Sequence, residues 1–279
     1  MLDIMKLDEI ILMSFKEDMP FGDITTDNII SENSQSVGNL IAKESGVIAG
    51  MPVVKRTFDI LDSNVKIDIF FDDGSRVEKG DIIATITGKT VALLKGERTA
   101  LNLLQRLSGI ATRTSSMCKV IEGYKTKVVD TRKTTPGLRY LEKYAVRAGG
   151  GQNHRYSLSD GVLIKDNHIM AAGGVRQAVS LIRGKIPHTI KIEVEVEDMQ
   201  MVKDALDARA DIIMLDNMTL EMMSEAVTLI DGRSIVEASG DINENTILDV
   251  AKTGVDIISI GRITHSIKAM DISLRILKS

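Results

Sequence analysis

The chain has 279 residues, of which 43% are hydrophobic and 27% charged, which is typical of a folded globular protein and not of a disordered one. Its formal net charge of −4 and its lack of Trp disfavour a protein that binds nucleic-acid phosphates or stacks on bases. The single Cys118 excludes an internal disulfide, and the sequence contains no zinc or iron–sulfur spacing.

The amino-terminal residues do not have the pattern of a signal peptide. Met1–Lys6 lack a basic region followed by a long apolar core, so we expect no signal peptide. No apolar run approaches the roughly 20 residues that cross a bilayer. These features predict a cytoplasmic protein that contacts neither membrane nor nucleic acid.

The first part of the chain mixes helix and strand patterns. Apolar residues at helical spacing mark the start, and alternating residues mark a half-buried strand further on. The predicted elements are a helix at 4–15, a turn and a capped segment at 17–26, a hairpin at 39–50, a helix at 53–61 and a strand at 66–70.

Residues 73–89 offer an alternative for this part of the chain. Two short strands joined by Lys79-Gly80-Asp81 resemble the small β-sandwich of lipoyl and biotinyl carrier domains. Lys89 lies one residue before the place of the modified lysine, and no second half of a carrier follows. We therefore favour a β-rich domain that packs against another element, and keep a non-catalytic carrier or binding protein as the competing hypothesis.

A strong helix pattern covers 97–119, with small residues on its apolar stripe that suit close packing. Arg98, Arg106 and Arg113 lie off that stripe. Taken alone, each is predicted to be a solvated surface arginine.

From residue 126 onward, apolar strands alternate with helix patterns. The strands are predicted at 127–130, 161–165, 189–195, 211–216, 234–239 and 255–261, with helices at 174–183, 199–209, 220–230 and 243–253. This alternation indicates parallel βαβ units and favours a (β/α) barrel, complete or incomplete. The alternative is an open doubly wound sheet, which the lack of G-x-G-x-x-G after the first strand disfavours.

Nearly every predicted strand ends in polar residues, where a barrel carries its chemistry. The stretch 130–168 also holds seven Arg and Lys residues on an acidic chain, which predicts a pocket for a small polyanion. On the third strand the alternation predicts that Lys191, Glu193 and Glu195 point inward. We expect Lys191 to pair with a glutamate and Glu195, nearest the mouth, to be functional.

Two kinds of charge therefore meet at one rim. Cations for carboxylates or phosphates come from Arg132, Lys133, Arg155 and Lys165. Glu195 and Asp216 suit ribose hydroxyls, or Mg²⁺ carried in by a phosphate ligand. From the residues alone, the sequence predicts a barrel enzyme that acts on a phosphorylated sugar and a carboxylate.

The motifs Asp130–Gly137, Gly151–Arg155 and Lys165–His168 resemble those of the quinolinate phosphoribosyltransferases, or carboxylating nicotinate-nucleotide pyrophosphorylases. The resemblance continues along nearly the whole chain, through Glu97–Asn102, Leu107–Thr112, Glu193–Val196, Leu215–Asn217, Ser239-Gly240 and Thr264–Ser266. It implies transfer of phosphoribosyl from phosphoribosyl pyrophosphate to quinolinate with Mg²⁺, which yields nicotinate mononucleotide, pyrophosphate and CO2 in NAD synthesis. A related phosphoribosyltransferase-like protein of molybdenum-transport gene neighbourhoods is the close alternative.

The resemblance also implies the architecture. An amino-terminal open α/β sandwich (1–112, with 268–279 returning to it) precedes an incomplete α/β barrel (113–267). The family forms a homodimer or a higher even oligomer, in which each site combines one barrel with the first domain of a neighbouring subunit.

By the same resemblance, the substrate-binding residues divide between the two ligands. Arg132, His154, Arg155 and Lys165 would hold the carboxylates of quinolinate, with Arg98 reaching in from a neighbour. Thr131 and Lys133 would contact the phosphoribosyl donor near the reacting centre, where Lys133, Glu195 and Asp216 are the predicted catalytic residues and Glu195 and Asp216 the candidates for Mg²⁺. The 5′-phosphate would bind Ser239, Gly240 and Gly261.

The sequence departs from the family pattern after Ser239-Gly240. Asp241 stands where relatives commonly have Gly or Asn. A carboxylate there repels phosphate unless it turns away, and we expect it to cap the helix that begins near Asn243. Arg139, Lys143 and Arg147, on the intervening helix, are predicted to have ordinary surface roles or to give secondary support to the site.

Overall fold

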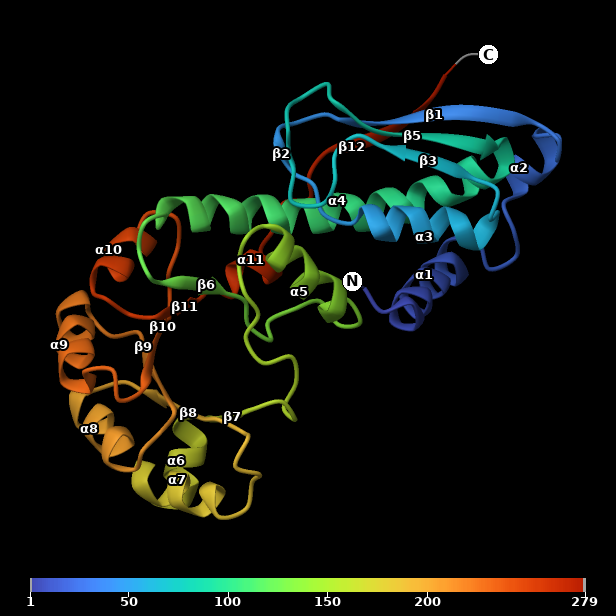
Figure 1. The fold of residues 1–279 in the computed structure, drawn as a ribbon. Helices are drawn as coiled ribbons and strands as arrows, with labels where there is room; N and C mark the ends of the chain where they lie inside the picture. Colours follow the sequence, from blue (N-terminus) through green and yellow to red (C-terminus); the bar gives the residue numbers. More distant parts are fainter. Residues whose placement is uncertain (1, 278–279) are drawn as a thin grey trace. The chain divides into compact units, whose positions relative to one another are not determined.

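The computed structural model describes residues 2–277, which form two compact units (Figure 1). The first unit contains the residues up to Ser115, the segment Thr134–Gly150 and the residues from Ser266 onward. The second contains Ser116–Lys133 and Gly151–His265. The segment Thr134–Gly150, which the prediction gave to the barrel, thus groups with the first unit because its helix is bonded there.

The first unit is built on a four-stranded antiparallel sheet in the order β12-β1-β5-β3. Its strands are β12 (Ile272–Ile276), β1 (Gln35–Ala42), β5 (Ile82–Lys89) and β3 (Lys66–Ile69). The carboxyl-terminal strand β12 therefore returns to pair with β1, so the chain ends in the unit where it began.

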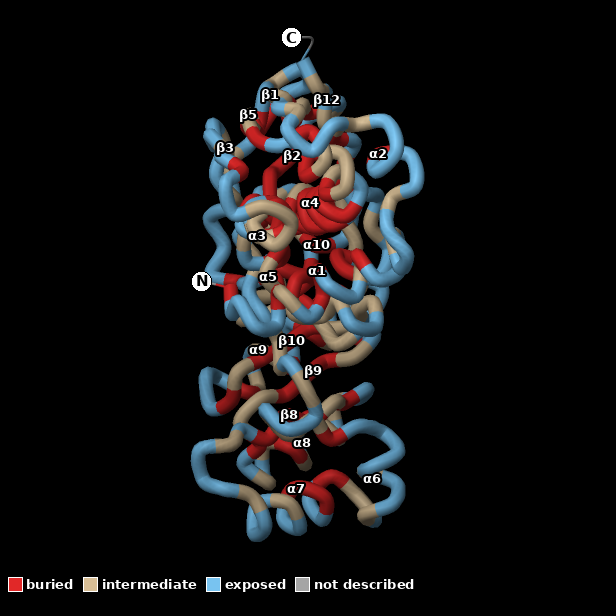
Figure 2. The backbone as a smooth tube through the Cα atoms, turned by 90° about the vertical axis from the view of Figure 1, so that its right-hand side faces the viewer, coloured by how far each residue is buried: buried red, intermediate tan, exposed pale blue. Residues whose placement is uncertain are grey.

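Helices α3 (Met51–Leu61) and α4 (Thr90–Val120) pack on one face of this sheet. The core joins Leu40 and Ile86 of the sheet to Phe58 of α3 and Leu104 of α4, all of them 0–1% exposed. Figure 2 shows how much of α4 is buried. The predicted α/β sandwich is therefore confirmed.

The helices near the amino terminus follow the predicted pattern. α1 (Ile4–Asp18) buries its apolar stripe, and α2 (Ile24–Ile29) is capped by Asp23, whose Oδ1 accepts hydrogen bonds from the backbone N–H groups of Thr25 and Thr26 at 3.0 Å. The long helix α4 begins at Thr90, earlier than the predicted residue 97. No helix among residues 2–277 is long and apolar enough to cross a membrane.

The predicted hairpin at 39–50 is wrong. β1 has β12 on one side and β5 on the other, so both of its edges are occupied. β2 (Gly46–Val47) pairs instead with β4 (Arg76–Val77) in a separate ribbon. β1 therefore pairs with strands that are distant in the sequence and not with the adjacent segment at 46–50. β4 and β5 consequently lie in different sheets, which removes the basis of the carrier hypothesis.

Two basic residues predicted at the surface are not fully solvated, since Arg106 keeps 27% of its side chain exposed and Lys143 is buried. The guanidinium of Arg106 donates from Nε (2.8 Å) and Nη2 (2.6 Å) to Oε1 of Glu142, a side chain with 0% exposure on α5 (Arg139–Ala148). Lys143, on the same helix, is buried at 4% exposure. Both corrections have one cause, which is that α5 packs into the first unit.

The second unit contains a six-stranded parallel sheet in the order β6-β11-β10-β9-β8-β7. The strands are β6 (Lys127–Val129), β7 (Val162–Ile164), β8 (Ile192–Val196), β9 (Ile212–Asp216), β10 (Ile235–Ser239) and β11 (Ile257–Ser259). From β7 to β11 each strand lies beside its predecessor, without the reversal of a doubly wound sheet. In the part of the chain that the structure describes, β6 and β7 do not pair, so the barrel is incomplete as expected.

Helices connect the consecutive strands from β7 to β11. They are α6 (Asp166–Ala172), α7 (Val175–Arg183), α8 (Met199–Asp207), α9 (Leu220–Ile230) and α10 (Ile247–Lys252), and a short helix, α11 (Arg262–His265), follows β11. Ile192, Val194 and Val196 on β8 are all buried at 0% exposure, while Glu193 and Glu195 take the opposite, inward face. This confirms the predicted alternation and aims the polar ends of the strands at one mouth.

Candidate active site

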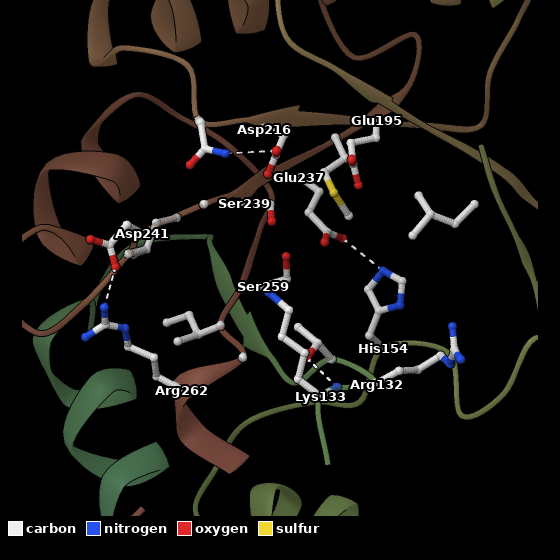
Figure 3. Close-up of a pocket in the computed structure, with 18 of the residues that line it drawn as sticks. Arg132, Lys133, His154, Glu195, Asp216, Glu237, Ser239, Asp241, Ser259 and Arg262 are labelled. Atoms are coloured by element: carbon white, nitrogen blue, oxygen red, sulfur yellow. Dashed lines mark hydrogen bonds and ion pairs between the residues drawn. The ribbon is translucent and has the colours of Figure 1, made fainter. Parts of the chain in front are cut away.

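A cavity of ≈ 720 Å³ opens at the carboxyl ends of the parallel strands. Twelve of the thirteen predicted substrate-binding residues line it: Thr131, Arg132, Lys133, His154, Arg155, Lys165, Glu195, Asp216, Ser239, Gly240, Asp241 and Gly261. The thirteenth, Arg98, lies exposed on α4 in the first unit. Segments more than a hundred residues apart in the sequence are thus brought to one site (Figure 3).

Asp130 positions the cationic loop and is itself fully buried, at 0% exposure. Its Oδ1 accepts from the backbone N–H of His154 at 2.9 Å, and its Oδ2 accepts from Nδ2 of Asn153 at 2.6 Å. A bridge between Val129 and Gln152 ties the loop to β6. Asp130 therefore holds His154 and the neighbouring Arg155 beside the cavity.

Lys133 is fixed from two sides of the second unit. Its backbone N–H donates to Oγ1 of Thr131 at 3.0 Å, and its carbonyl accepts from Oγ1 of Thr264 at 2.8 Å. A Cβ at Gly261 would lie 2.9 Å from Cδ of Lys133. Gly261 thus leaves room for the lysine stem to reach over β11 into the cavity.

The acidic residues stand across from these cations. Glu195 accepts a hydrogen bond from Nζ of Lys165 at 2.5 Å, with 13% of its side chain exposed. Asp216 accepts at Oδ2 from Nδ2 of Asn217 at 2.9 Å. Gly240 has φ +129, and a Cβ there would lie 2.5 Å from Oδ1 of Asn217, so the loops after β9 and β10 interlock only with glycine at this position.

The expected capping role of Asp241 is wrong. α10 begins at Ile247, and the carboxylate of Asp241 binds Nη2 of Arg262 at 2.7 Å instead (Figure 3). The intervening turn uses Thr246 Oγ1, which accepts from the backbone N–H of Asn243 at 3.0 Å. Arg262 therefore neutralises the carboxylate that would repel an anion at this rim.

His154 lies against two buried carboxylates. Its Nε2 is 3.1 Å from Oε2 of Glu193 and 3.5 Å from Oε2 of Glu237. Burial lowers the pKa of His154, but hydrogen bonds and attraction from these carboxylates outweigh it and raise the pKa to about 10. The backbone N–H of Arg155 donates to Nδ1 at 2.8 Å, which leaves Nε2 to donate to the carboxylates.

Glu193 does not pair with Lys191, contrary to expectation. β8 begins at Ile192, and Lys191 is exposed just before it. Burial raises the pKa of Glu193, against the hydrogen bond from His154, which lowers it. The loop that Asp130 anchors supplies the partner that the strand itself does not.

Several lining residues received no role from the sequence. Glu237 and Ser259 stood out only as polar strand residues, Asn217 and His265 only within motifs of the resemblance, and Arg262 not at all. The alternation along β10 and β11 was the available signal for the first two, because Glu237 precedes Ser239, and Ser259 precedes Gly261, by two residues.

Oxygen-only ligands suit Mg²⁺, and Glu195 and Asp216 provide them at the mouth. A second group of potential metal ligands, His154, Glu193 and Glu237, has ligand atoms within 4.8 Å of one another. It fits a metal less well, because Arg155 donates to Nδ1, and a neutral ring then carries its proton on Nε2, where the metal would bind.

The fold and the cavity define an α/β-barrel protein whose strand ends line a cavity with both cations and carboxylates. The chain belongs to the quinolinate phosphoribosyl transferase family. The family's amino-terminal domain matches residues 23–108 and its carboxyl-terminal domain matches residues 110–275.

The chain is also similar to individual relatives. It is 45% identical over 260 residues to a probable nicotinate-nucleotide pyrophosphorylase (carboxylating) from Bacillus subtilis, covering 93% of this chain and 90% of the relative. It is 43% identical to the corresponding protein of Methanocaldococcus jannaschii, covering 97% of each. Among solved structures it resembles NadC from Streptococcus pyogenes, with a TM-score of 0.95 and 43% identity over 100% of this chain and 99% of that one.

Proposed function

We propose that this enzyme transfers the phosphoribosyl group of phosphoribosyl pyrophosphate to quinolinate, with release of pyrophosphate and CO2. The product is nicotinate mononucleotide, so the reaction is a step of de novo NAD synthesis. The observation that carries the proposal is the cavity itself. Cations suited to carboxylates and phosphates face carboxylates suited to a sugar, within one family-typical barrel.

The cationic side of the cavity receives quinolinate in this proposal. Arg132, Arg155 and Lys165 bind the two carboxylates, and His154 supports them from the floor. Arginine offers paired donors that match a carboxylate, which fixes the plane of the ring as well as its position. The ring nitrogen then faces the carboxylate side, where the sugar binds.

The carboxylate side receives the phosphoribosyl donor. Glu195 and Asp216 hold the ribose and oppose the positive charge that develops at its C1. Thr131 and Lys133 bind near the reacting centre, and the loops at Ser239-Gly240 and Gly261 receive the 5′-phosphate. Glu195 and Asp216 would hold Mg²⁺ that arrives with the donor, and the ion would supply positive charge against the pyrophosphate.

The proposed reaction joins the ring nitrogen to the sugar and then removes CO2 from the ring. The ring nitrogen forms a bond to C1 while the bond from C1 to pyrophosphate breaks, and Lys133 offsets the charge of the leaving group. The pyridinium formed withdraws electrons from the adjacent ring carbon. That carbon loses CO2, keeps the electron pair and then takes a proton.

We further propose a homodimer in which Arg98 of one subunit completes the quinolinate site of the other, within a cytoplasmic enzyme. Arg98 is exposed on α4 and is therefore available to a neighbour. Arg98→Ala and Lys133→Ala proteins are each expected to be inactive, and a mixture of the two is expected to recover activity, since hybrid dimers keep one intact site. No recovery despite proven subunit exchange would contradict the shared site.

The activity is tested by mixing the protein with quinolinate, phosphoribosyl pyrophosphate and Mg²⁺. We expect stoichiometric CO2 and nicotinate mononucleotide. Lys133→Ala serves as the inactive reference, and nicotinate replaces quinolinate as the substrate control. Absence of turnover, or turnover with nicotinate alone, would refute the proposal and favour the phosphoribosyltransferase-like proteins of molybdenum-transport neighbourhoods.

A further inference from the structure

Two buried side-chain oxygens face the cavity without a hydrogen-bond partner among residues 2–277. They are Oε1 of Glu237 and Oγ of Ser259, on side chains that belong to residues 1% and 4% exposed. Both residues line the cavity, and Figure 3 shows the carboxylate of Glu237 and the hydroxyl of Ser259 pointing into it. A buried polar atom left unpaired loses its hydrogen bonds to water without replacement, so such a pair of atoms in a cavity indicates a bound group.

The register of the sheet places Glu237 among the other carboxylates. Glu195 on β8 and Glu237 on β10 both lie opposite Met214 on β9. With adjacent strands about 4.8 Å apart, their backbones are about 10 Å apart at the same depth. Asp216 lies two residues nearer the mouth, level with Ser239. The three carboxylates therefore surround one space, with Glu237 on its far side.

The missing partner of Glu237 has to be a hydrogen-bond donor, because an ionised carboxylate only accepts. Lys165 is bound to Glu195. His154 directs Nε2 at Oε2 of Glu237 and at Glu193, which leaves Oε1 of Glu237 toward the cavity. The donor that Oε1 lacks is therefore expected from the ligand.

The chemistry of the two proposed substrates narrows the choice to one kind of group. Ionised quinolinate offers carboxylate oxygens and a ring nitrogen, all of which accept. Fully ionised phosphate and pyrophosphate groups accept as well. Only the hydroxyls of the ribose can donate, and each of them can also accept a hydrogen bond from Ser259.

We propose that Glu237 and Ser259 bind one ribose hydroxyl of the phosphoribosyl donor. The hydroxyl donates to Oε1 of Glu237 and accepts from Oγ of Ser259. This inference rests on the proposed function and adds a third carboxylate to the sugar site. Because the hydroxyl is fixed from β10 and β11, the ribose is held on the side opposite Glu195, which orients C1 toward the incoming ring nitrogen.

The test measures donor binding by calorimetry with Mg²⁺ and without quinolinate. Glu237→Gln keeps the size of the side chain and removes its charge, and Ser259→Ala removes one hydroxyl. Loss of a hydrogen bond to a charged group predicts a Kd for phosphoribosyl pyrophosphate about 10- to 100-fold higher in Glu237→Gln. Ser259→Ala is expected to raise it about 3- to 10-fold and to leave the Kd for quinolinate unchanged, since Oγ of Ser259 makes no hydrogen bond to the quinolinate-binding residues that the structure describes.

A second arm identifies the hydroxyl. The 2-deoxy and 3-deoxy analogues of the donor are titrated into the wild type and into Glu237→Gln. One analogue is expected to bind the wild type at least tenfold more weakly than the donor does. The Kd of that analogue is expected to rise less than threefold from wild type to Glu237→Gln, because the analogue already lacks the contact with Glu237. Glu193→Gln is the matched control, since Glu193 also binds His154 but does not line the cavity.

The outcomes separate this inference from the proposed function. Unchanged donor affinity in both folded variants, or equal penalties for the analogues in wild type and Glu237→Gln, would overturn the role of Glu237. If Glu237→Gln fails to fold, Ser259→Ala decides by the same criteria. A wild type that binds the donor yet makes no nicotinate mononucleotide from quinolinate would instead refute the proposed function.

Discussion

Removing Arg106 is expected to destabilise the protein strongly, although the sequence alone marks it as a surface arginine. Its guanidinium makes two bonds to Oε1 of Glu142, at 2.8 and 2.6 Å, and one from Nη2 to Oγ1 of Thr135 at 2.6 Å. Glu142 is 0% exposed. In Arg106→Met, the carboxylate of Glu142 still accepts a hydrogen bond from the backbone N–H of Thr135 at 3.2 Å, but it loses the positive charge of the guanidinium.

Breaking a buried ion pair on one side costs about 3–5 kcal/mol, because the remaining charge is neither solvated nor paired. For proteins of this size, 1 kcal/mol lowers Tm by roughly 2–4 °C, so a fall of roughly 6–20 °C is expected. Far-ultraviolet circular dichroism in a thermal or urea melt measures it, and suits a chain without Trp.

Two further variants isolate the cause. Arg98→Ala, exposed on the same helix, is expected to change stability by less than about 0.5 kcal/mol. Arg106→Met combined with Glu142→Gln is expected to recover at least about half of the loss, since no buried charge remains unpaired. A single Arg106→Met protein as stable as the wild type, or a double variant no better than the single one, would refute the reasoning.

Three other outcomes follow from the second unit. Gly240→Ala should weaken donor binding at least tenfold, because Gly240 has φ +129 and a Cβ there would lie 2.5 Å from the amide oxygen of Asn217. Gly232→Ala, where a Cβ would meet nothing within 4 Å, should not weaken donor binding. Equal calorimetric affinities of the two variants for the donor would contradict this prediction. His154 has its pKa raised to about 10 in the folded state, so its stabilisation is complete below about pH 6.5 and lost as pH rises to about 10. The Tm of the wild type should therefore fall over that range by roughly 5–15 °C more than the Tm of His154→Gln, and parallel curves would argue against the charged ring. At low salt, Asp241→Asn should tighten donor binding and Arg262→Ala should weaken it, each by about 2- to 5-fold. The double variant should bind the donor about as tightly as the wild type, since the two charges cancel. Unchanged donor affinity in Arg262→Ala would show that the pair lies too far from the phosphate.

Local pattern in the sequence was sufficient where neighbours along the chain decide the structure. The helix at Met51–Leu61 and the parallel strands of the barrel follow from apolar spacing, and the capped turn at Asp23 from short-range hydrogen bonds. Alternation on β8 also placed Glu195 on the inward face. Polar residues at successive strand ends thus predicted most of the cavity lining before any contact between strands was known.

Pairing between distant segments was beyond that pattern. β1 could not be assigned its partners β12 and β5, because hydrogen bonding between strands carries no mark in either sequence. For the same reason Arg106 looked solvated until α5 brought Glu142 beside it, and Asp241 looked like a helix cap until Arg262 approached from the next loop.

The sequence by itself therefore determined the family, the order of the elements and the kinds of charge at the mouth of the barrel. Only the tertiary structure decided which charges meet. Burial and partners from other strands determine how stable a charged side chain is, as in the contact of His154 with Glu193 and Glu237. The same enclosure left one oxygen of Glu237 buried and unpaired in the cavity, a property of the assembled strands that no stretch of sequence contains.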